Sequence, residues 1–107
     1  MEIRRLTEAA YKATFAYRMH DVSGSARPTI DVDPYLDQIP ADDLEGFELV
    51  SDGVRQVYRD AHDRYEHVLF PLDPSDTCLV IVLDLRNTWV HGHFLLHLGN
   101  TSSRTRP

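Results

Sequence analysis

Residues 78–98 read CLVIVLDLRNTWVHGHFLLHL, which is two apolar runs joined by the short polar stretch RNT. A link this short makes two neighbouring strands antiparallel, because a parallel pair needs a much longer connection. The first run, 78–85, is apolar at nearly every position, which is typical of a strand covered on both faces of a sheet. The sequence therefore predicts a hairpin of two strands, with Arg86 and Asn87 as its turn.

Three earlier segments have the same strand character. FELV (47–50) and VRQVY (54–58) flank a Ser-Asp-Gly tripeptide, and Asp-Gly is a strong hairpin signal. YEHVLFPL (65–72) follows, and the turn residues DPSDT separate it from the next strand. We therefore expect about five meandering, mainly antiparallel strands over residues 47–98.

The N-terminal part of the chain has a helical pattern. In residues 2–20, apolar side chains recur at 3.6-residue spacing, and the stripe consists of Ile3, Leu6, Ala10, Ala13 and Tyr17. Residues 21–46 are expected to form an acidic loop with short helical turns, and residues 99–107 a disordered polar tail. The prediction is a single α+β domain, residues 1–98, with the N-terminal helix packed on one face of the sheet.

The predicted register assigns the side chains of the last three strands to two faces. Val68 lies opposite Ile81 and Leu79 opposite Phe94, and the face under the helix then carries Val68, Phe70, Leu79, Ile81, Leu83, Val90, Phe94 and Leu96. The second face carries Tyr65, His67, Leu69, Cys78, Val80, Val82, Asp84, Trp89, His91, His93, Leu95 and His97.

One helix covers only one face of a sheet, so the second face requires another cover. Each large apolar side chain left in water forgoes about 1.5–3 kcal/mol, and exposed patches of this size usually mark an interface. We expect a second copy of the chain, a different partner or the acidic loop to cover this face. A second ridge on the helix adds to the expected interface, which consists of Tyr11, Phe15, Met19, Leu69, Val80, Val82, Trp89 and Leu95. The simplest assembly is a homodimer.

Three of the four histidines on the second face suggest a metal site as an alternative. His91 and His93 are two residues apart, so in a regular strand their imidazoles point the same way and could share an ion such as zinc. His67 is the candidate third ligand, but it is two strands from His91 in the predicted register. The leading expectation is therefore no metal and no cofactor, with His91 and His93 at the margin of the interface.

Two catalytic arrangements were weighed. Cys78 lies diagonal to His93 in the predicted register and could form a thiolate–imidazole pair, although a lone cysteine in an apolar strand is more often a core residue. The segment RDAHDRYEH also gathers titratable groups, namely Asp60, His62, Asp63, Glu66 and His67. Since turns are rich in such residues because they are solvated, no catalytic residue is assigned and a non-enzyme is favoured.

Composition limits the kinds of partner. The net charge of −6 argues against nucleic acid or an anionic membrane surface as the main partner. No apolar run is long enough to span a bilayer, the N-terminus lacks a signal-peptide core, and Cys78 is the single cysteine, so we expect a cytoplasmic protein. Residues 31–48 contain seven acidic and no basic residues, and could dock a basic protein partner.

The segments YEHVLFPLDPSDTCLVIVLDL (65–85) and GHFLLHL (92–98) resemble small bacterial proteins of uncharacterised function. The resemblance covers about the last third of the chain, implies a compact bacterial domain, and assigns no catalytic or binding residue. The function expected from the sequence is a non-enzymatic, self-associating interaction or regulatory domain. The alternatives are a metal-binding protein or enzyme with its histidines on the second face, and an adaptor that binds through the acidic loop.

Overall fold

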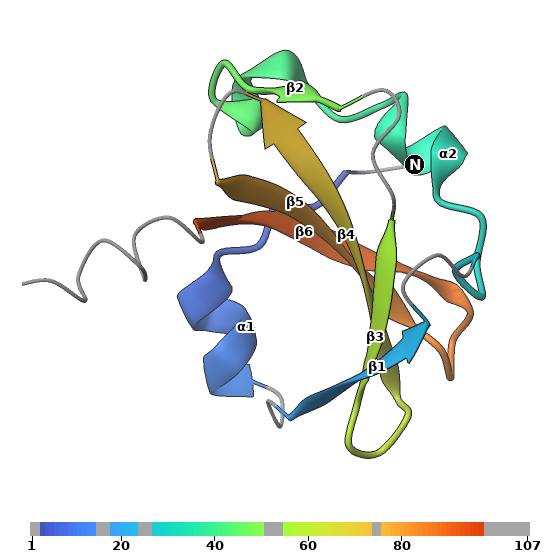
Figure 1. The fold of residues 1–107 in the computed structure, drawn as a ribbon. Helices are drawn as coiled ribbons and strands as arrows, with labels where there is room; N and C mark the ends of the chain where they lie inside the picture. Colours follow the sequence, from blue (N-terminus) through green and yellow to red (C-terminus); the bar gives the residue numbers. More distant parts are fainter. Residues whose placement is uncertain (1–2, 15–17, 24–26, 51–54, 74–75, 98–107) are drawn as a thin grey trace, which may run out of the picture.

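The computed structural model describes residues 3–14, 18–23, 27–50, 55–73 and 76–97, and it has the predicted α+β class (Figure 1). The elements in chain order are α1 (Glu8–Thr14), β1 (Met19–Ser23), α2 (Asp33–Leu36), the 3-10 helix η1 (Ala41–Leu44), β2 (Glu48–Leu49), β3 (Gln56–Asp60), β4 (Tyr65–Asp73), β5 (Thr77–Asp84) and β6 (Trp89–His97). The described sheet has six strands, one more than predicted, because β1 lies across the boundary between the expected helix (2–20) and the expected acidic loop (21–46). The expected tail, 99–107, lies outside the described residues.

The described strand pairs of the sheet are all antiparallel, and short links join the partners in the consecutive pairs from β3 to β6. The hairpin predicted between residues 47–50 and 54–58 is wrong, because β2 pairs with β4 and not with β3. The order is β1-β3-β4-β5-β6, and β2 pairs with β4 off this path. The register between β4 and β5 is the predicted one, with Val68 opposite Ile81 and Phe70 opposite Leu79. Side chains therefore alternate between the two faces of β4 and β5 in the way the sequence indicated.

The predicted N-terminal helix over residues 2–20 is wrong in its extent. Among the described residues of this segment, the helix covers only α1. It begins after Thr7, whose Oγ1 accepts a hydrogen bond from the Ala10 backbone N–H at 3.0 Å. The residues before Thr7 instead run beside β6, where Leu6 N donates to His93 O at 2.6 Å. The residues from Met19 onward form an edge strand on β3. Pairing with the sheet satisfies these backbone groups and overrides the helical periodicity.

A β-bulge changes the register between β5 and β6. Near the turn, Leu83 lies opposite Val90 as predicted, but beyond it Val82 lies opposite Gly92, and His91 is the extra residue. Every side chain after the bulge therefore lies on the face opposite to the prediction. Leu79 faces Leu95 instead of Phe94.

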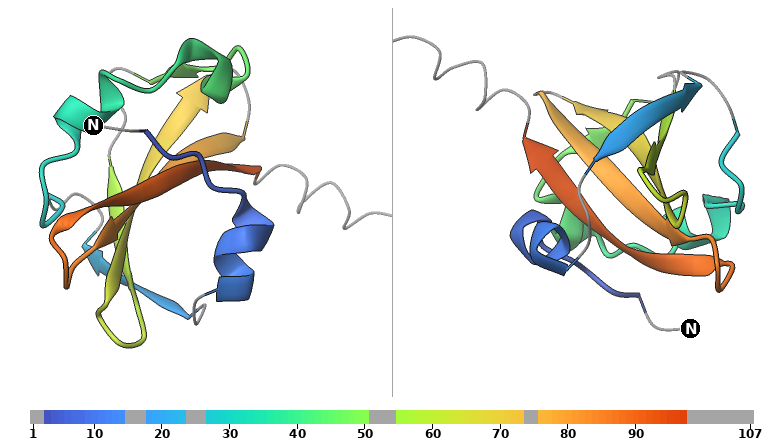
Figure 2. Two further views of the ribbon diagram at one scale, coloured as in Figure 1. Left: turned by 180° about the vertical axis from the view of Figure 1, so that it is seen from behind. Right: turned by 90° about the horizontal axis from the view of Figure 1, so that it is seen from below.

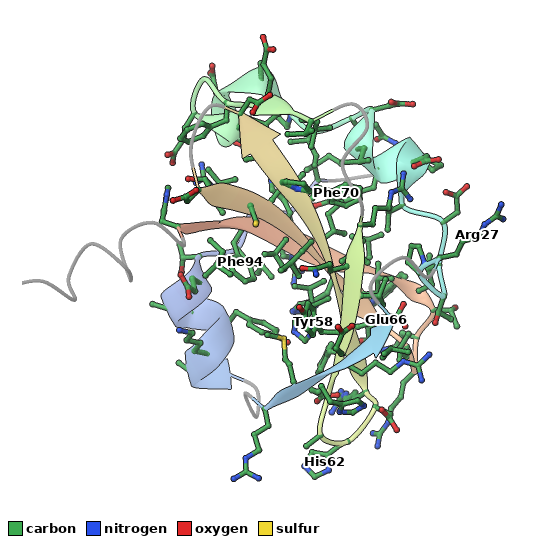
Figure 3. The ribbon with its side chains drawn as sticks, in the orientation of Figure 1. Arg27, Tyr58, His62, Glu66, Phe70 and Phe94 are labelled. Carbon is green, nitrogen blue, oxygen red and sulfur yellow. The ribbon has the colours of Figure 1, made fainter. Side chains whose placement is uncertain are left out.

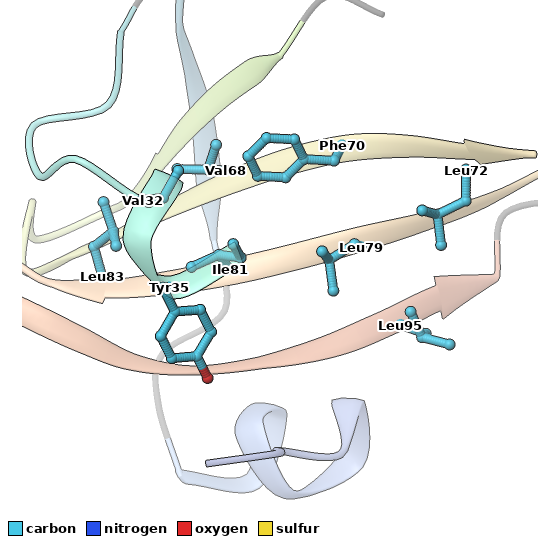
Figure 4. Packing of buried hydrophobic residues seen from close by; sticks show 9 residues of the cluster. All are labelled: Val32, Tyr35, Val68, Phe70, Leu72, Leu79, Ile81, Leu83 and Leu95. Carbon is cyan, nitrogen blue, oxygen red and sulfur yellow. The ribbon is translucent and has the colours of Figure 1, made fainter. Parts of the chain in front are cut away.

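Both faces of the sheet are covered within the chain. The first cluster joins sheet residues to the segment around α2, and it consists of Val32, Tyr35, Val68, Phe70, Leu72, Leu79, Ile81, Leu83 and Leu95 (Figure 4). The second cluster includes the α1 residue Tyr11, and it consists of Tyr11, Tyr65, Val80, Val82 and Phe94. Phe70 and Phe94 mark the two sides in Figure 3. The face expected under the helix is thus covered by the acidic segment.

Gly92 allows the N-terminal segment to lie close to β6. A Cβ atom at this position would be 2.8 Å from Leu6 Cγ and 3.0 Å from Arg4 O, which is closer than van der Waals contact permits. The segment before α1 can therefore pair with β6 only because residue 92 has no side chain.

We predict that Gly92→Ala lowers the free energy of unfolding by about 1–3 kcal/mol, because the added methyl group overpacks this contact. Urea denaturation measures the change. In the double variant Leu6→Ala/Gly92→Ala, two of the three close contacts are absent, so its cost should be smaller than the sum of the two single costs. Strictly additive costs would contradict this explanation.

Candidate functional site

The bulge separates the histidines that the sequence had grouped on one face. His93 lies with Ile81 on the side of the first cluster, whereas His67 lies on the side of the second. Each is buried and bonded to a tyrosine from a covering segment. Tyr35 Oη is 2.7 Å from His93 Nδ1, and Tyr11 Oη is hydrogen-bonded to His67 Nε2.

His93 connects three segments of the chain. Its Nε2 is 3.0 Å from Asp43 Oδ2 in η1, and the Tyr35 hydroxyl also donates to Arg4 O at 3.0 Å. Asp43 is in turn 3.9 Å from Arg5, which pairs with Glu45 at 3.1 Å. Burial lowers the pKa of His93, although its hydrogen bond to Asp43 opposes the shift. His93 therefore acts as a buried crosslink between the acidic segment, the N-terminal segment and β6.

Burial has a large effect on the pKa of His67. Burial lowers its pKa to about 4, although the charge of Asp60 acts in the opposite direction. Hydrogen bonding with the backbone of Tyr58 also opposes the shift. His67 is therefore a neutral residue that holds α1 through Tyr11.

The alternative metal site does not form in this arrangement. His67 and His93 are on opposite faces of the sheet, so they cannot share an ion with His91. Among the described residues, no group of three or more His, Cys, Asp or Glu side chains is placed to hold a metal ion. The spacing argument fails because the bulge interrupts the alternation on which it relied.

The two catalytic arrangements are also not assembled. Cys78 is on the face of Val80, opposite to His93, and burial raises the pKa of its thiol. Glu66 and His67 are consecutive residues of β4 and point to opposite faces, where Glu66 accepts hydrogen bonds from Thr29 and Arg59. Thus the titratable groups of residues 59–67 do not converge on one site.

The residues expected at the interface differ in their exposure to solvent. Tyr11, Val80, Val82 and Leu95 are buried within the chain, so the argument from an uncovered sheet face no longer applies to them. Leu69 is half-buried, Met19 and Trp89 are exposed, and Phe15 lies outside the described residues. The physical reason is that the N-terminal segment, α1 and the acidic segment together cover two faces. Self-association itself stays a prediction.

The acidic segment uses several of its carboxylates within the chain. Asp33 pairs with Arg55 at 2.8 Å, and Asp43 and Glu45 face Arg5. These three are therefore engaged in holding the segment on the sheet, and a basic partner at this loop stays a prediction.

The ribbon in Figure 2 shows the N-terminal segment, α2 and the β5–β6 hairpin on the same side of the molecule. A cleft of about 770 Å³ opens where these three parts meet. The described residues that line it are Ile3, Arg4, Arg5, Ile30, Asp31, Pro34, Tyr35, Gln38, Thr88, Trp89, Val90 and His91. Trp89 has the largest exposed fraction among the exposed large hydrophobic residues, at 59%. The cleft thus combines apolar walls with a few polar and charged groups, as small-molecule sites do.

The hairpin places Trp89 and His91 in the cleft. The Asp84 carboxylate accepts hydrogen bonds from the backbone N–H groups of Arg86 and Asn87 and from the Asn87 side chain. Thr88 takes a positive φ of 59°, and its N–H donates to Asp84 O. The connection is therefore a wider turn than the predicted two-residue one, and it is fixed by Asp84.

Two titratable side chains of the cleft have shifted pKa values. Burial raises the pKa of Tyr35 to about 12, so its phenol stays neutral. Burial also lowers the pKa of His91, and the positive charge of Arg4 lowers it further, while Asp84 opposes both effects. At neutral pH the fixed charges of the cleft are therefore those of its arginines and Asp31.

Sequence reasoning identified Trp89 and His91 in this region but not their neighbours. Ile3 and Arg4 were assigned to a helix, and Tyr35 to an irregular loop. Threonine is favoured at the N-cap, the residue just before a helix, so Thr7 was the available signal that the helix starts later. No local signal indicates that Tyr35 reaches β6.

Comparisons of the chain with models of known families, with curated proteins and with solved structures found no match. The resemblance to small bacterial proteins therefore stays a prediction. Within the described residues, no helix has the length and apolar character needed to cross a membrane.

We predict that acid destabilises the protein through His67. The folded-state pKa of about 4 is below the ordinary 6.5, so the unfolded chain takes up a proton first as the pH falls. Above pH 6.5 His67 is neutral in both the folded and the unfolded chain, so the free energy of unfolding has its full value there. Between pH 6.5 and 4 it falls by about 3 kcal/mol. Urea denaturation of the wild type and of His67→Gln measures this, since glutamine does not titrate there.

The stability difference between the two proteins should change by this amount over the pH range. His62→Gln is the matched control, because His62 is exposed in the β3–β4 turn (Figure 3) and should leave the pH profile unchanged. If His67→Gln gives the same profile as the wild type, His67 is not the group responsible.

Proposed function

We propose that the protein is a non-enzymatic binding module whose ligand site is the cleft between the N-terminal segment, α2 and the β5–β6 hairpin. The cleft itself is the observation that carries this proposal. Its volume of about 770 Å³ lies in the range of small-molecule sites, about 300–1,000 Å³. Trp89 forms an apolar wall that remains 59% exposed although the chain covers both faces of its sheet. An exposed tryptophan beside a cleft favours binding of a flat apolar group.

The side chains of the cleft favour binding over catalysis. No serine, cysteine or lysine is among its described lining residues. The Thr88 hydroxyl donates to Asn87 O, and the raised pKa of Tyr35, about 12, makes its phenol a poor base or nucleophile. His91 is the lining group whose ordinary pKa is close to neutral, and a histidine alone is an incomplete catalytic unit.

The test uses naphthalene-2-methanol, a neutral flat probe, and amide chemical shifts in NMR. Saturable shifts are expected at Ile3, Trp89 and Val90 at a ligand concentration of about 1 mM, typical of a small fragment. Absence of saturation, or shifts confined to residues outside the cleft, would contradict the proposed site.

We predict that Trp89→Ala weakens binding of this probe about two- to tenfold, because one aromatic contact is worth about 0.5–1.5 kcal/mol. The fold should persist, since the side chain is mainly exposed. Leu49→Ala is the matched control, because Leu49 is an exposed apolar residue of β2 that does not line the cleft. Equal losses in both variants would show that the probe binds exposed apolar surface without using the cleft.

Self-association is the second candidate, and the edge of the sheet favours it. β1 pairs with β3 on one side, and its Met19 and Val22 are 37% and 42% exposed. An exposed edge strand with apolar side chains is a template for pairing with a second copy.

We predict a dimeric solution mass that becomes monomeric in Val22→Lys. A monomeric wild type at high protein concentration would refute this candidate and leave the binding module unaffected.

A further inference from the structure

The two arginines of the cleft differ in their surroundings. Arg5 is paired with Glu45 at 3.1 Å and lies 3.9 Å from Asp43. Arg4 is exposed, and among the described residues no carboxylate forms an ion pair with its side chain. The guanidinium of Arg4 is therefore the uncompensated positive charge in the cleft.

The position of Arg4 is fixed by its backbone. Arg4 O accepts hydrogen bonds from His93 N at 3.2 Å and from the Tyr35 hydroxyl at 3.0 Å. These bonds hold the residue beside β6 at the cleft, where the charge of its guanidinium acts on both His91 and Tyr35. Because the backbone of Arg4 is already fixed, less conformational entropy is lost when its side chain binds a ligand.

The surroundings of His91 are also positive. The charge of Arg64 acts on His91 together with that of Arg4, while Asp84 is the carboxylate that opposes them. Arg64 stacks over the Tyr65 ring at 5.2 Å, and its Nε is a buried atom without a hydrogen-bond partner among the described residues. Asp31 is the acidic lining residue, and its Oδ1 accepts the Asp33 N–H at 3.1 Å. The His91 end of the cleft is therefore suited to a negative group.

We infer that the ligand of the cleft is a small planar carboxylic acid, with its carboxylate held by Arg4 beside His91 and its flat apolar body against Trp89. This inference rests on the proposed function, because it specifies the ligand of the same site. Arginine presents a planar fork of donors that matches a carboxylate, which makes such contacts stronger and more directional than neutral ones. Contacts with Ile3, Ile30 and Val90 would contribute to the binding free energy of any flat apolar compound. The charge of the ligand therefore distinguishes a carboxylic acid from the other compounds.

The experiment compares three compounds with the same flat body: 2-naphthoate, naphthalene-2-methanol and naphthalene-2-methylamine. The carboxylate should bind at least about threefold more tightly than the alcohol, since a partly exposed charge pair is worth about 0.2–1 kcal/mol and bidentate geometry adds to it. The amine should bind most weakly. An alcohol that binds as tightly as the carboxylate would overturn the inference and still support the cleft as a binding site. If none of the three binds, the proposed function itself fails.

Arg4→Gln should abolish the preference for 2-naphthoate and leave the affinity for the alcohol within about twofold of the wild type. Arg18→Gln is the matched control, because Arg18 is an exposed arginine that does not line the cleft. A preference that persists in Arg4→Gln, or is lost equally in Arg18→Gln, would show that Arg4 does not bind the carboxylate.

Titration of His91 gives a readout that does not depend on a variant. A bound carboxylate adds a negative charge near a ring on which the charges of Arg4, Arg64 and Asp84 act and which contacts the Tyr65 ring. The pKa of His91, followed by its ring proton shifts, should therefore rise when 2-naphthoate binds and change little with the alcohol. An unchanged pKa at saturation with 2-naphthoate would place the carboxylate elsewhere.

Discussion

The β-bulge at His91 is the constraint on which the rest of the arrangement depends. Because one extra residue is inserted before Gly92, the second half of β6 presents its side chains to the opposite faces. His93 then points toward the acidic segment, and Phe94 toward α1. The same local geometry brings Gly92 against Leu6, so the chain before α1 can extend the sheet.

Two buried tyrosine–histidine pairs attach the covering segments to the sheet. Tyr35 of α2 bonds His93 on one face, and Tyr11 of α1 bonds His67 on the other. A hydrogen bond between a buried hydroxyl and a buried imidazole is directional, so it specifies how each segment docks on otherwise non-directional apolar surface. This gives a structural reason for histidines in apolar strands. Burial lowers the pKa of both imidazoles, and their hydrogen bonds to the covering segments account for their presence without a metal ion.

The cleft arises from the same docking. The N-terminal segment, held at Arg4 O by Tyr35 and His93, forms one wall, and the hairpin fixed by Asp84 forms another. Trp89, which precedes the bulge and lies next to the turn, remains 59% exposed beside these walls. A binding site at this place combines a hydrogen-bonded backbone with exposed side chains, which is the usual division between scaffold and recognition surface.

The sequence by itself determined the antiparallel strands β3 to β6 and the register of β4 on β5, because short polar links and alternating apolar residues act locally. It also indicated that both faces of the sheet need a cover. Only the tertiary structure decided which segments supply it. Sheet pairing made the residues before Thr7 extended, and the bulge at His91 reassigned His93 and Leu95. Both effects depend on contacts between residues far apart in the chain, whose energies exceed local propensity and leave no periodic signal.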